Sequence, residues 1–430
     1  MNKFRNPLFV IFITVFIDLV GFGILIPVIP LLLGDPTSKF YLSTPGANPQ
    51  EQFKNGLIIL GFLTAAFPLA QFFATPILGQ LSDKYGRKKL LFISLAGTCI
   101  SYMIFALGII TKNIPLLFAS RIFDGITGGN IAVAQAAIAD ITTPENRAKN
   151  FGLIGAAFGL GFVLGPYIGG KLSDSNVVSW FDATTPFWFA AILSALNLVS
   201  IYFFFPETLK NKMNDKKIEW TKSVHNIIKA ARSHNAPAFL TNFIFNAGFT
   251  FFTTFASVYF FNKFHMNQGN VGDLFAYVGI WIAISQAVVT PILAKRLKEF
   301  QVLKFSLFMT ALGILLIFLS NEVWQLLLIM PILSIGNGLT FANIAGLISR
   351  TADDDIQGEV LGINFSVQAL GQAIPPILSG YIAASLAPES PLLVGAIVGV
   401  LAGIVFNIFY FKYKLPEKKD KDTSNEMALG

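Results

Sequence analysis

The sequence predicts an all-α polytopic membrane protein with twelve transmembrane helices in two pseudo-symmetric six-helix bundles. Of its 430 residues, 54% are hydrophobic and only 13% are charged, with a mean hydropathy of +0.63. Soluble domains carry about 25% charged residues, so this composition excludes a soluble globular protein. The other two observations behind the prediction are a series of long apolar runs and a repeat between the two halves of the chain.

The apolar runs are about 20 residues long, which is enough for a helix to cross a hydrocarbon layer of ~30 Å. The first run contains Asp18 and is followed by no A-x-A-like cleavage site, so we interpret it as an uncleaved span. The expected spans are 8–33, 56–78, 88–110, 114–138, 150–171, 184–205, 238–261, 270–294, 302–319, 323–348, 358–385 and 391–411.

Polar segments divide these spans into domains. A cytoplasmic linker, 206–236, separates an N-terminal bundle, 1–205, from a C-terminal bundle, 237–411, and a polar cytoplasmic tail, 412–430, follows that we expect to be disordered. The loop 34–55, with its prolines, is expected to be irregular. Apolar residues at helical spacing within the linker predict an amphipathic helix on the membrane surface: Trp220, Val224, Ile227, Ile228 and Ala231.

The two halves repeat each other. Thr75-Pro-Ile-Leu78 recurs as Thr290-Pro-Ile-Leu293 in the corresponding span. Such a duplication predicts a site at the interface of the halves, near the middle of the membrane, that is reached alternately from each side. Four positions of the fifth span also recur 210 residues later in the eleventh, namely Gly152, Gly161, Pro166 and Gly170 as Gly362, Gly371, Pro376 and Gly380.

The net charge of +7 follows the membrane topology and does not indicate a nucleic-acid partner. With both termini in the cytoplasm, all Lys and Arg fall on the cytoplasmic side except six. We therefore expect a multi-pass monomer in the plasma (inner) membrane, in contact with the lipid bilayer. Its one cysteine, Cys99, allows no intramolecular disulfide and is expected to serve packing. The six exceptions are Lys39, Lys54, Lys112, Arg121, Lys171 and Lys263.

A basic turn, residues 79–89, joins the second and third expected spans. Gly79 and Gly86 would allow sharp backbone turns there, and one carboxylate, Asp83, stands among the cations. The pattern G-x-L-x-D-x-x-G-R-[RK] resembles the loop between the second and third helices of the major facilitator superfamily of secondary transporters. In that family the Asp and the Arg belong to an inner gate. The resemblance implies that Asp83 and Arg87 help to close the cytoplasmic mouth, together with Asp140.

Three ionisable residues lie at membrane depth, where such groups are costly and mark functional candidates. Asp18 lies ~15 Å deep and Arg121 ~11 Å deep at 1.5 Å per residue, with Asp124 one turn beyond Arg121. Arg121 and Asp124 are three residues apart and could simply form a structural pair. Alternatively, Asp18 or Asp124 binds a proton and releases it when Arg121 approaches, which would couple transport to a proton gradient.

The fifth expected span carries a glycine stripe at residues 161, 165 and 169, where another helix could approach closely. It resembles the G-x-x-x-G-P-x-x-G-G signature of antiporters in the superfamily, and helix packing is a compatible explanation. The residues that match are Gly161, Gly165, Pro166, Gly169 and Gly170.

Further motifs resemble the twelve-helix drug/H⁺ antiporter branch, nearest to tetracycline efflux proteins. They are Asp18 to Pro30, Arg121 to Gly129, and Pro206-Glu207-Thr208. Two departures argue against tetracycline itself as the substrate. Ser101 stands where tetracycline exporters carry an acidic residue, and the eighth and ninth spans have no His or acid at depth except Asp273 near the outer rim.

The fold implied by this resemblance has a transport cavity, and polar amides in its helices are candidates to contact substrate. Buried amides can equally hydrogen-bond neighbouring helices. The candidates are Asn130, Gln135, Asn246, Gln286, Asn337 and Asn343.

The sequence therefore predicts a secondary active transporter that exports small amphipathic compounds by proton-coupled alternating access. One alternative is a proton symporter for a sugar or organic acid, and another is a transporter-like receptor or scaffold. The three histidines, His225, His234 and His265, have no metal-ligand spacing, and no G-x-S-x-G or H-E-x-x-H motif occurs. We expect no enzyme, no cofactor and no metal; the partners are the substrate and H⁺.

Overall fold

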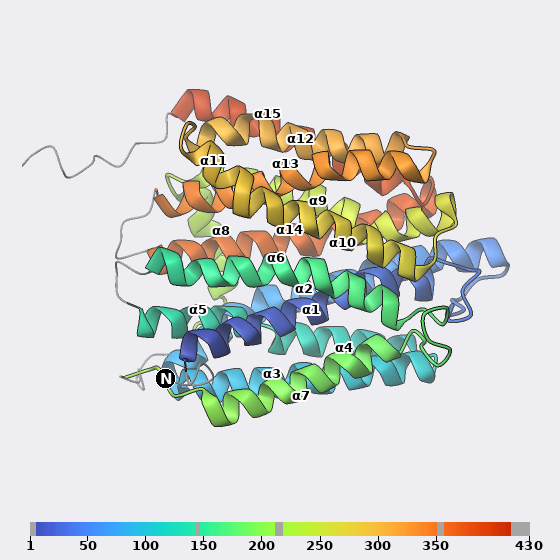
Figure 1. The fold of residues 1–430 in the computed structure, drawn as a ribbon, viewed down its shortest axis with the longest axis horizontal. Coiled ribbons are helices and arrows are strands. Elements are labelled where there is room, and N and C mark those ends of the chain that lie inside the picture. Colours follow the sequence, from blue (N-terminus) through green and yellow to red (C-terminus); the bar gives the residue numbers. More distant parts are fainter. Residues whose placement is uncertain (1–5, 143–146, 211–217, 351–356, 414–430) are drawn as a thin grey trace, which may run out of the picture.

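A computed structural model describes residues 6–142, 147–210, 218–350 and 357–413. These residues form long helices that run roughly side by side (Figure 1). The helices are α1 (Pro7–Leu33), α2 (Pro49–Tyr85), α3 (Arg87–Ile110), α4 (Ile114–Thr127), α5 (Asn130–Ile141), α6 (Arg147–Leu172), α7 (Thr185–Phe204), α8 (Lys222–Arg232), α9 (Ala236–Phe264), α10 (Gln268–Ile284), the π-helical turn η3 (Ser285–Val289), α11 (Thr290–Ala294), α12 (Glu299–Leu319), α13 (Val323–Arg350), α14 (Gln357–Ser385) and α15 (Ser390–Tyr413).

The described part of the chain contains ten helical segments that are long and apolar enough to cross a membrane. One of them, Ile114–Ile141, comprises α4 and α5, and another, Gln268–Ala294, runs from α10 through α11. Two further helices, α6 and α14, have 26 and 29 residues, which is ~39 Å and ~43 Å at 1.5 Å per residue. The all-α polytopic fold is confirmed, while the count of twelve spans stays a prediction at α6 and α14.

The outside of the bundle is apolar, as a lipid-facing surface requires. On α7, Ile192, Leu196, Val199 and Phe203 are each more than half exposed, and their spacing places them on one face. A contiguous exposed apolar face of this kind is rare on soluble proteins. This face of α7 is therefore suited to contact lipid.

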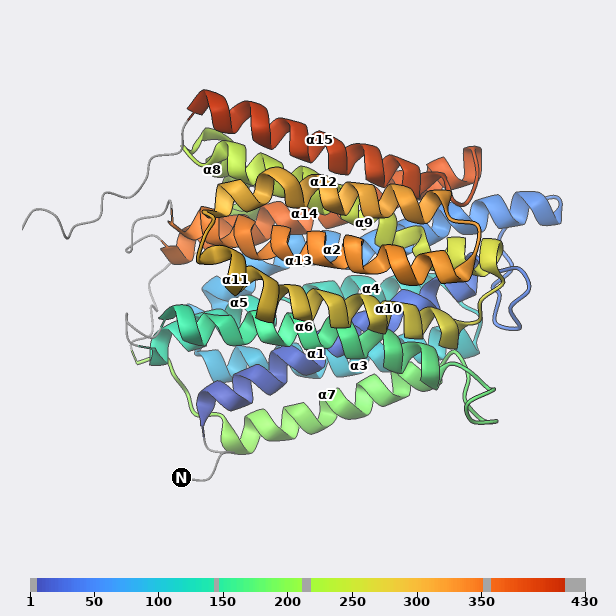
Figure 2. The same ribbon diagram turned by 45° about the horizontal axis from the view of Figure 1, so that its top comes forward.

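Helix α2 is longer than the expected span 56–78 at both ends. Asn48 caps it, because its side chain accepts a hydrogen bond from the backbone N–H of Glu51 at 2.8 Å, and Pro49 occupies the first helical position. The expectation of an irregular loop is therefore wrong for 49–55, and this end of α2 extends past its neighbours in Figures 1 and 2.

The other end of α2 corrects the interpretation of the basic turn. The helix continues through Gly79 to Tyr85, so Gly79 is a helical residue and only Gly86 makes the turn into α3. A glycine inside a helix costs only about 1 kcal/mol, and the backbone hydrogen bonds on both sides of Gly79 outweigh that cost.

Two expected spans are interrupted in the structure. Gly128 and Gly129 separate α4 from α5, and a Cβ on Gly129 would lie 3.0 Å from the Thr75 Cα of α2. The span 270–294 contains the π-helical turn η3, where the Thr290 hydroxyl donates to the Ser285 carbonyl oxygen at 2.9 Å. Such interruptions often occur at functional sites.

The repeat in the sequence is visible in the packing. Gly161 of α6 lies against Leu19 of α1, and its counterpart Gly371 of α14 lies against Asn246 of α9. One face of each glycine-rich helix thus packs within its own half of the chain. The boundaries 1–205, 206–236, 237–411 and 412–430 stay predictions, and parts of the linker and tail lie outside the described residues.

Other glycines of α6 and α14 make contacts between the two halves. Gly170 of α6 lies against Gly272 of α10, and its counterpart Gly380 of α14 lies against Leu57 of α2. These two contacts lie far from the basic turn along the helices, at the end that α2 overhangs. The halves are therefore packed closely together at the end opposite the basic turn.

Helix α8 lies in the linker and contacts both halves. The Ser223 hydroxyl donates to the Phe72 carbonyl oxygen of α2 at 2.7 Å, and the Asn226 amide donates to the Ser366 hydroxyl of α14 at 3.0 Å. Of the residues expected to form an apolar face, Ile227 is partly buried against a buried apolar cluster, and the other four are exposed, namely Trp220, Val224, Ile228 and Ala231. The fully buried residues of α8 are Ser223, Asn226 and Ala230, so most of the expected apolar face points away from the protein.

Candidate functional site

A cavity of about 140 Å³ lies between α1 to α5 of the first half and α14 of the second. Two of the side chains that line it are acidic, Asp18 and Asp124, and within the described residues no Lys, Arg or His lines it. The other lining side chains that carry a ring or an amide are Phe22, Phe67, Phe72, Tyr102 and Phe365, and Gln71, Asn130, Gln368 and Gln372.

Asp18 is placed by the middle of α1 and is held on one side only. Its Oδ2 accepts a hydrogen bond from the side-chain amide of Asn130, whereas its buried Oδ1 makes no hydrogen bond with any described residue. Asn130 is the first residue of α5, so the break at Gly128 and Gly129 brings this amide to Asp18. One carboxylate oxygen of Asp18 is therefore left for a ligand or a proton.

Arg121 and Asp124 of α4 form a buried ion pair. The Arg121 Nη1 lies 3.2 Å from the Asp124 Oδ2, and the two residues are 1% and 3% exposed. The guanidinium also lies over the Phe105 ring at 4.8 Å and the Tyr102 ring at 5.8 Å, which adds cation–π attraction. Asp124 lines the cavity and Arg121 does not, so the carboxylate stands between the cavity and its cation.

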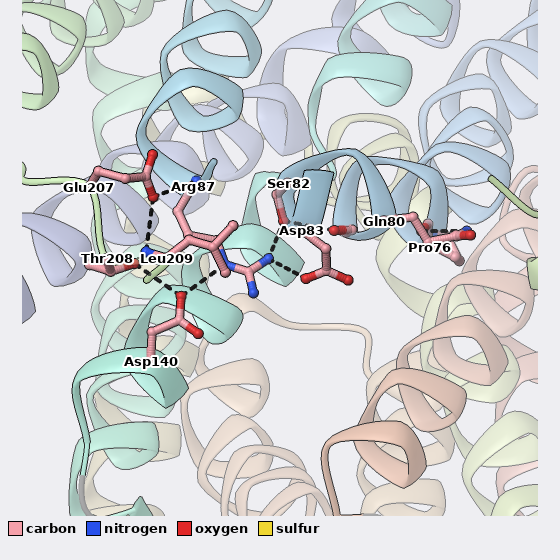
Figure 3. A network of polar contacts seen from close by, with 10 residues as sticks. Pro76, Gln80, Ser82, Asp83, Arg87, Asp140, Glu207, Thr208 and Leu209 are labelled. Atoms are coloured by element: carbon pink, nitrogen blue, oxygen red, sulfur yellow. Dashed lines mark hydrogen bonds and ion pairs between the residues drawn. The ribbon is translucent and has the colours of Figure 1, made fainter. Parts of the chain in front are cut away.

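Arg87 is the centre of a polar network at the basic turn (Figure 3). Its Nε donates to the Asp140 Oδ2 at 2.9 Å, and its Nη1 donates to the Asp83 Oδ1 at 2.7 Å and the Ser82 hydroxyl at 2.5 Å. Asp140 also accepts a hydrogen bond from the Thr208 hydroxyl at 3.1 Å. The structure thus brings together the three charged residues that the sequence nominated for the gate.

The turn itself depends on Gly86, whose φ is +102°. A Cβ at this position would lie 2.3 Å from the Glu207 side chain, which accepts hydrogen bonds from the backbone N–H groups of Arg87 and Lys88. Glu207 therefore caps the start of α3, a role that the sequence analysis missed. The charged residues Asp83, Arg87 and Asp140 belong to the first half of the chain, and Glu207 and Thr208 belong to the start of the linker.

The glycine stripe of α6 is a packing surface for α1. A Cβ on Gly161, Gly165 or Gly169 would come within 3 Å of α1 atoms. Gly165 faces Gly23 of α1, where the two backbones meet without side chains between them. Gly170 serves the contact with α10 described above, and Pro166 also lies against Gly23.

Of the six amides nominated from the sequence, Asn130 lines the cavity and the other five do not. Asn246 donates to the carbonyl and the side-chain oxygen of Asn242, and Asn343 donates to the Leu339 carbonyl oxygen. The remaining three are Gln135 on α5, Gln286 on η3 and Asn337 on α13. The Gln286 side chain faces Gly159 of α6, 3.8 Å from where a Cβ on that glycine would lie. The Asn337 Oδ1 is buried without a hydrogen bond to any described residue.

The sequence analysis missed the amides of the second and eleventh spans. Gln368 and Gln372 are four residues apart in an apolar helix, which places them on one face, and Gln71 stands alone in an apolar stretch of α2. This spacing is a usable signal in the sequence.

The two positions that depart from the tetracycline pattern do not line the cavity. The Ser101 hydroxyl forms a hydrogen bond with the Ser120 hydroxyl, and Asp273 forms an exposed ion pair with Lys171 at 2.8 Å.

Comparisons with known proteins agree with this architecture. The model of the Major Facilitator Superfamily matches residues 11–375 and 300–428. The chain belongs to this superfamily. Among its relatives is the class C tetracycline resistance protein of Escherichia coli, which is 33% identical over 381 residues, 87% of this chain and 89% of the relative.

Two further comparisons extend this result. The quinolone resistance protein NorA of Staphylococcus aureus is 27% identical over 416 residues, 94% of this chain and 96% of the relative. The crystal structure of a D-xylose-proton symporter superposes with a TM-score of 0.74 at 15% identity, covering 96% of this chain and 98% of that one. The major facilitator fold and the resemblance to drug efflux proteins are confirmed, and the chain belongs to a family of transporters, not of enzymes.

Proposed function

We propose that this major facilitator superfamily protein is a proton-coupled exporter of small amphipathic compounds that works by alternating access. The observation that carries the proposal is the cavity between the halves, where the buried Asp18 Oδ1 has no hydrogen-bond partner among the described residues. A carboxyl group that a cavity reaches and that no cation neutralises is suited to take up and release a proton. Asp18 is the proposed carrier, and the Arg121–Asp124 pair is the proposed partner in coupling.

The walls of the cavity support an amphipathic substrate. Phe22, Phe67, Phe72 and Phe365 offer aromatic surface, and the amides of Gln71, Asn130, Gln368 and Gln372 offer hydrogen bonds. A pocket of this kind binds an apolar body and orients it through a few polar groups. The tetracycline and quinolone resistance proteins among the relatives favour export of drug-like compounds.

The basic turn and both termini are proposed to lie in the cytoplasm of a cell whose plasma (inner) membrane holds the protein. The network of Asp83, Arg87 and Asp140, with Gly86, then belongs to the cytoplasmic gate. The cross-half contacts at Gly170 and Gly380 lie at the outer end, so the halves would separate there when the cavity opens outward. We retain Gly161, Gly165, Pro166, Gly169 and Gly170 as the antiporter helix motif.

The test measures transport in inside-out membrane vesicles with an imposed pH gradient. Tetracycline, a fluoroquinolone and fluorescent amphipathic dyes serve as probes. An exporter accumulates a probe when the vesicle interior is acidic, because protons leave as the probe enters. Accumulation that requires the opposite gradient identifies a symporter, and binding without flux under either gradient identifies a receptor.

The variant Asp18→Asn separates proton coupling from folding. We expect it to insert into the membrane normally and to reduce gradient-driven accumulation to the level of vesicles without the protein. Asp35→Asn is the matched control, because Asp35 lies in the loop after α1 and, among the described residues, its side chain accepts hydrogen bonds from the backbone N–H and the hydroxyl of Thr37 alone. Full accumulation by Asp18→Asn would contradict the proposed role of Asp18.

A further inference from the structure

The break between α4 and α5 leaves a backbone carbonyl group without its helical partner. In an unbroken helix, the Gly128 carbonyl oxygen would accept a hydrogen bond from the backbone N–H of Ala132, four residues further on. That N–H donates instead to the Gly129 carbonyl oxygen at 3.2 Å. The side-chain amide of Gln71 on α2 takes its place and donates to the Gly128 carbonyl oxygen at 2.9 Å. A glutamine of a neighbouring helix therefore satisfies the carbonyl group that the break frees.

Gln71 lies in the middle of the α2 face that packs against the break. Phe67, Gln71 and Thr75 follow one another at intervals of four residues, so they share this face. A Cβ on Gly125 would lie 2.5 Å from the Phe67 carbonyl oxygen and 3.2 Å from the Gln71 backbone nitrogen. A Cβ on Gly129 would lie 3.0 Å from the Thr75 Cα. These two glycines thus let α2 approach closely enough for the Gln71 amide to reach the break.

The break also decides where two groups of the candidate site lie. Asp124 belongs to the last turn of α4, and Asn130 is the first residue of α5. The Asn130 amide donates to the Asp18 Oδ2. The Gly128 carbonyl group that Gln71 holds comes two residues before Asn130 in the sequence, and both amides line the cavity with Asp18. A shift of this segment would therefore move the amide that holds Asp18.

We propose that Gln71 is a positioning residue for the Asp18 carboxyl group, a role that rests on the proposed proton coupling. Its amide fixes the break between α4 and α5 so that the Asn130 amide donates to Asp18. Gln71 thus acts on Asp18 through the backbone and through Asn130. This role differs from that of Gln368 and Gln372, which line the cavity from the second half and belong to one continuous helix, α14.

The first test is Gln71→Met in reconstituted vesicles, because methionine nearly keeps the length of the side chain and removes the donor. Counterflow exchange of a transported dye without a pH gradient reports binding and rocking of the halves, and accumulation driven by a pH gradient reports coupling. We expect the ratio of accumulation to counterflow to fall about tenfold, less than the ~100-fold that a misplacement of about 1 Å can cost. The dye concentration for half-maximal counterflow should stay within about twofold, because a positioning residue does not hold the dye.

A double-mutant cycle tests whether Gln71 acts through Asn130. Asn130→Ala removes the amide from Asp18 and should lower the same ratio about tenfold. Adding Gln71→Met to Asn130→Ala should then change the ratio by less than about twofold, because the amide that Gln71 positions is gone. A further tenfold fall in the double variant would mean that the two residues act independently, and it would overturn the proposal.

Two further variants separate the break from the rest of α2. Gly125→Ala keeps both amides, but its Cβ forces α2 away from α4, so we expect the same fall in the ratio. Gln80→Met is the matched control, because the Gln80 amide of α2 also donates to a backbone carbonyl oxygen, that of Glu219 at 3.2 Å, and does not line the cavity. It should leave the ratio unchanged. An equal fall with Gln80→Met would overturn the proposal, because the loss would not depend on the break.

An unchanged ratio in Gln71→Met would also overturn the positioning role. If the half-maximal dye concentration rose at the same time, Gln71 would be a residue that contacts the dye. If counterflow and accumulation fell in parallel, it would only support packing. Failure of the proposed function itself would be seen earlier, as an unaltered protein that accumulates no probe under either gradient.

Discussion

In the first half of the molecule, the buried polar groups at mid-span include ions, whereas those of the second half are amides and hydroxyls. Asp18, Arg121 and Asp124 lie at mid-span in the first half, and the corresponding middle parts of the second-half spans contain no Asp, Glu, Lys, Arg or His in the sequence. Of the described residues in the second half, those that line the cavity all belong to one helix, α14. The charge that could respond to a proton gradient is thus concentrated on one side of the interface.

The buried amides of the second half are mostly bonded to one another. Asn242 donates to the Asn364 side-chain oxygen at 2.7 Å, and Asn246 donates to the Asn242 side-chain oxygen at 2.8 Å. These bonds join α9 to α14 and leave little capacity for a ligand. Buried polar residues in this bundle therefore either line the cavity or hold helices together. Their hydrogen-bond partners distinguish these two roles better than the residue type does.

The largest effect on stability is expected from the buried ion pair of the first half. Arg121→Met removes the cation and leaves Asp124 without its ion-pair partner at 3% exposure. Breaking a buried pair in this way costs about 3–5 kcal/mol of unfolding free energy. Unfolding in mixed micelles, followed by circular dichroism, measures the change against the unaltered protein.

The double variant Arg121→Met with Asp124→Leu is the control for this prediction. It removes both charges, and apolar residues of similar volume can replace a buried pair at little cost. Most of the lost stability should therefore return, while gradient-driven transport stays absent. If Arg121→Met alone were as stable as the unaltered protein, Asp124 would need no cation. The buried ion pair would then not distinguish the first half from the second.

The sequence predicted much of this organisation because membrane spans and short charged motifs are local signals. Most of the spans and the repeat at an offset of 210 residues could be read from residue order, whereas the limits of α2 could not. The grouping of Asp83, Arg87 and Asp140 came from the resemblance of the basic turn to the superfamily. The breaks at Gly128 and η3 could not, because a glycine in an apolar run does not reveal which neighbouring helix presses on it. The spacing of Gln368 and Gln372 shows that they share a helix face, but which space that face meets depends on how the halves pack.

The basic turn allows a smaller test with two glycines of the same motif. Gly86 has a φ of +102° and lies against Glu207, whereas Gly79 is helical and a Cβ there meets open space. Gly86→Ala should cost about 1–3 kcal/mol through backbone strain and contact with Glu207, while Gly79→Ala should stabilise α2 by about 0.5–1 kcal/mol.

Thermal unfolding in detergent compares the two glycine variants directly. If Gly86→Ala and Gly79→Ala changed the unfolding free energy equally, the turn at Gly86 would not depend on its contact with Glu207. The second half provides a natural reference, because its corresponding loop, at Lys295, Arg296 and Lys298, has neither the Asp nor the two glycines. An alanine substitution in that loop should therefore have little effect on unfolding.

The smallest effect is expected in the amide cluster of the second half. Asn242→Leu removes the donor to Asn364, while Asn246 still donates to the backbone carbonyl oxygen of residue 242. Hydrogen bonds between membrane helices contribute about 0.6 kcal/mol on average and at most about 1.7. We therefore expect a loss of about 1 kcal/mol in unfolding free energy and unchanged gradient-driven transport. A loss of transport with normal stability would place a functional polar site in the second half, and the division of roles between the halves would then be wrong.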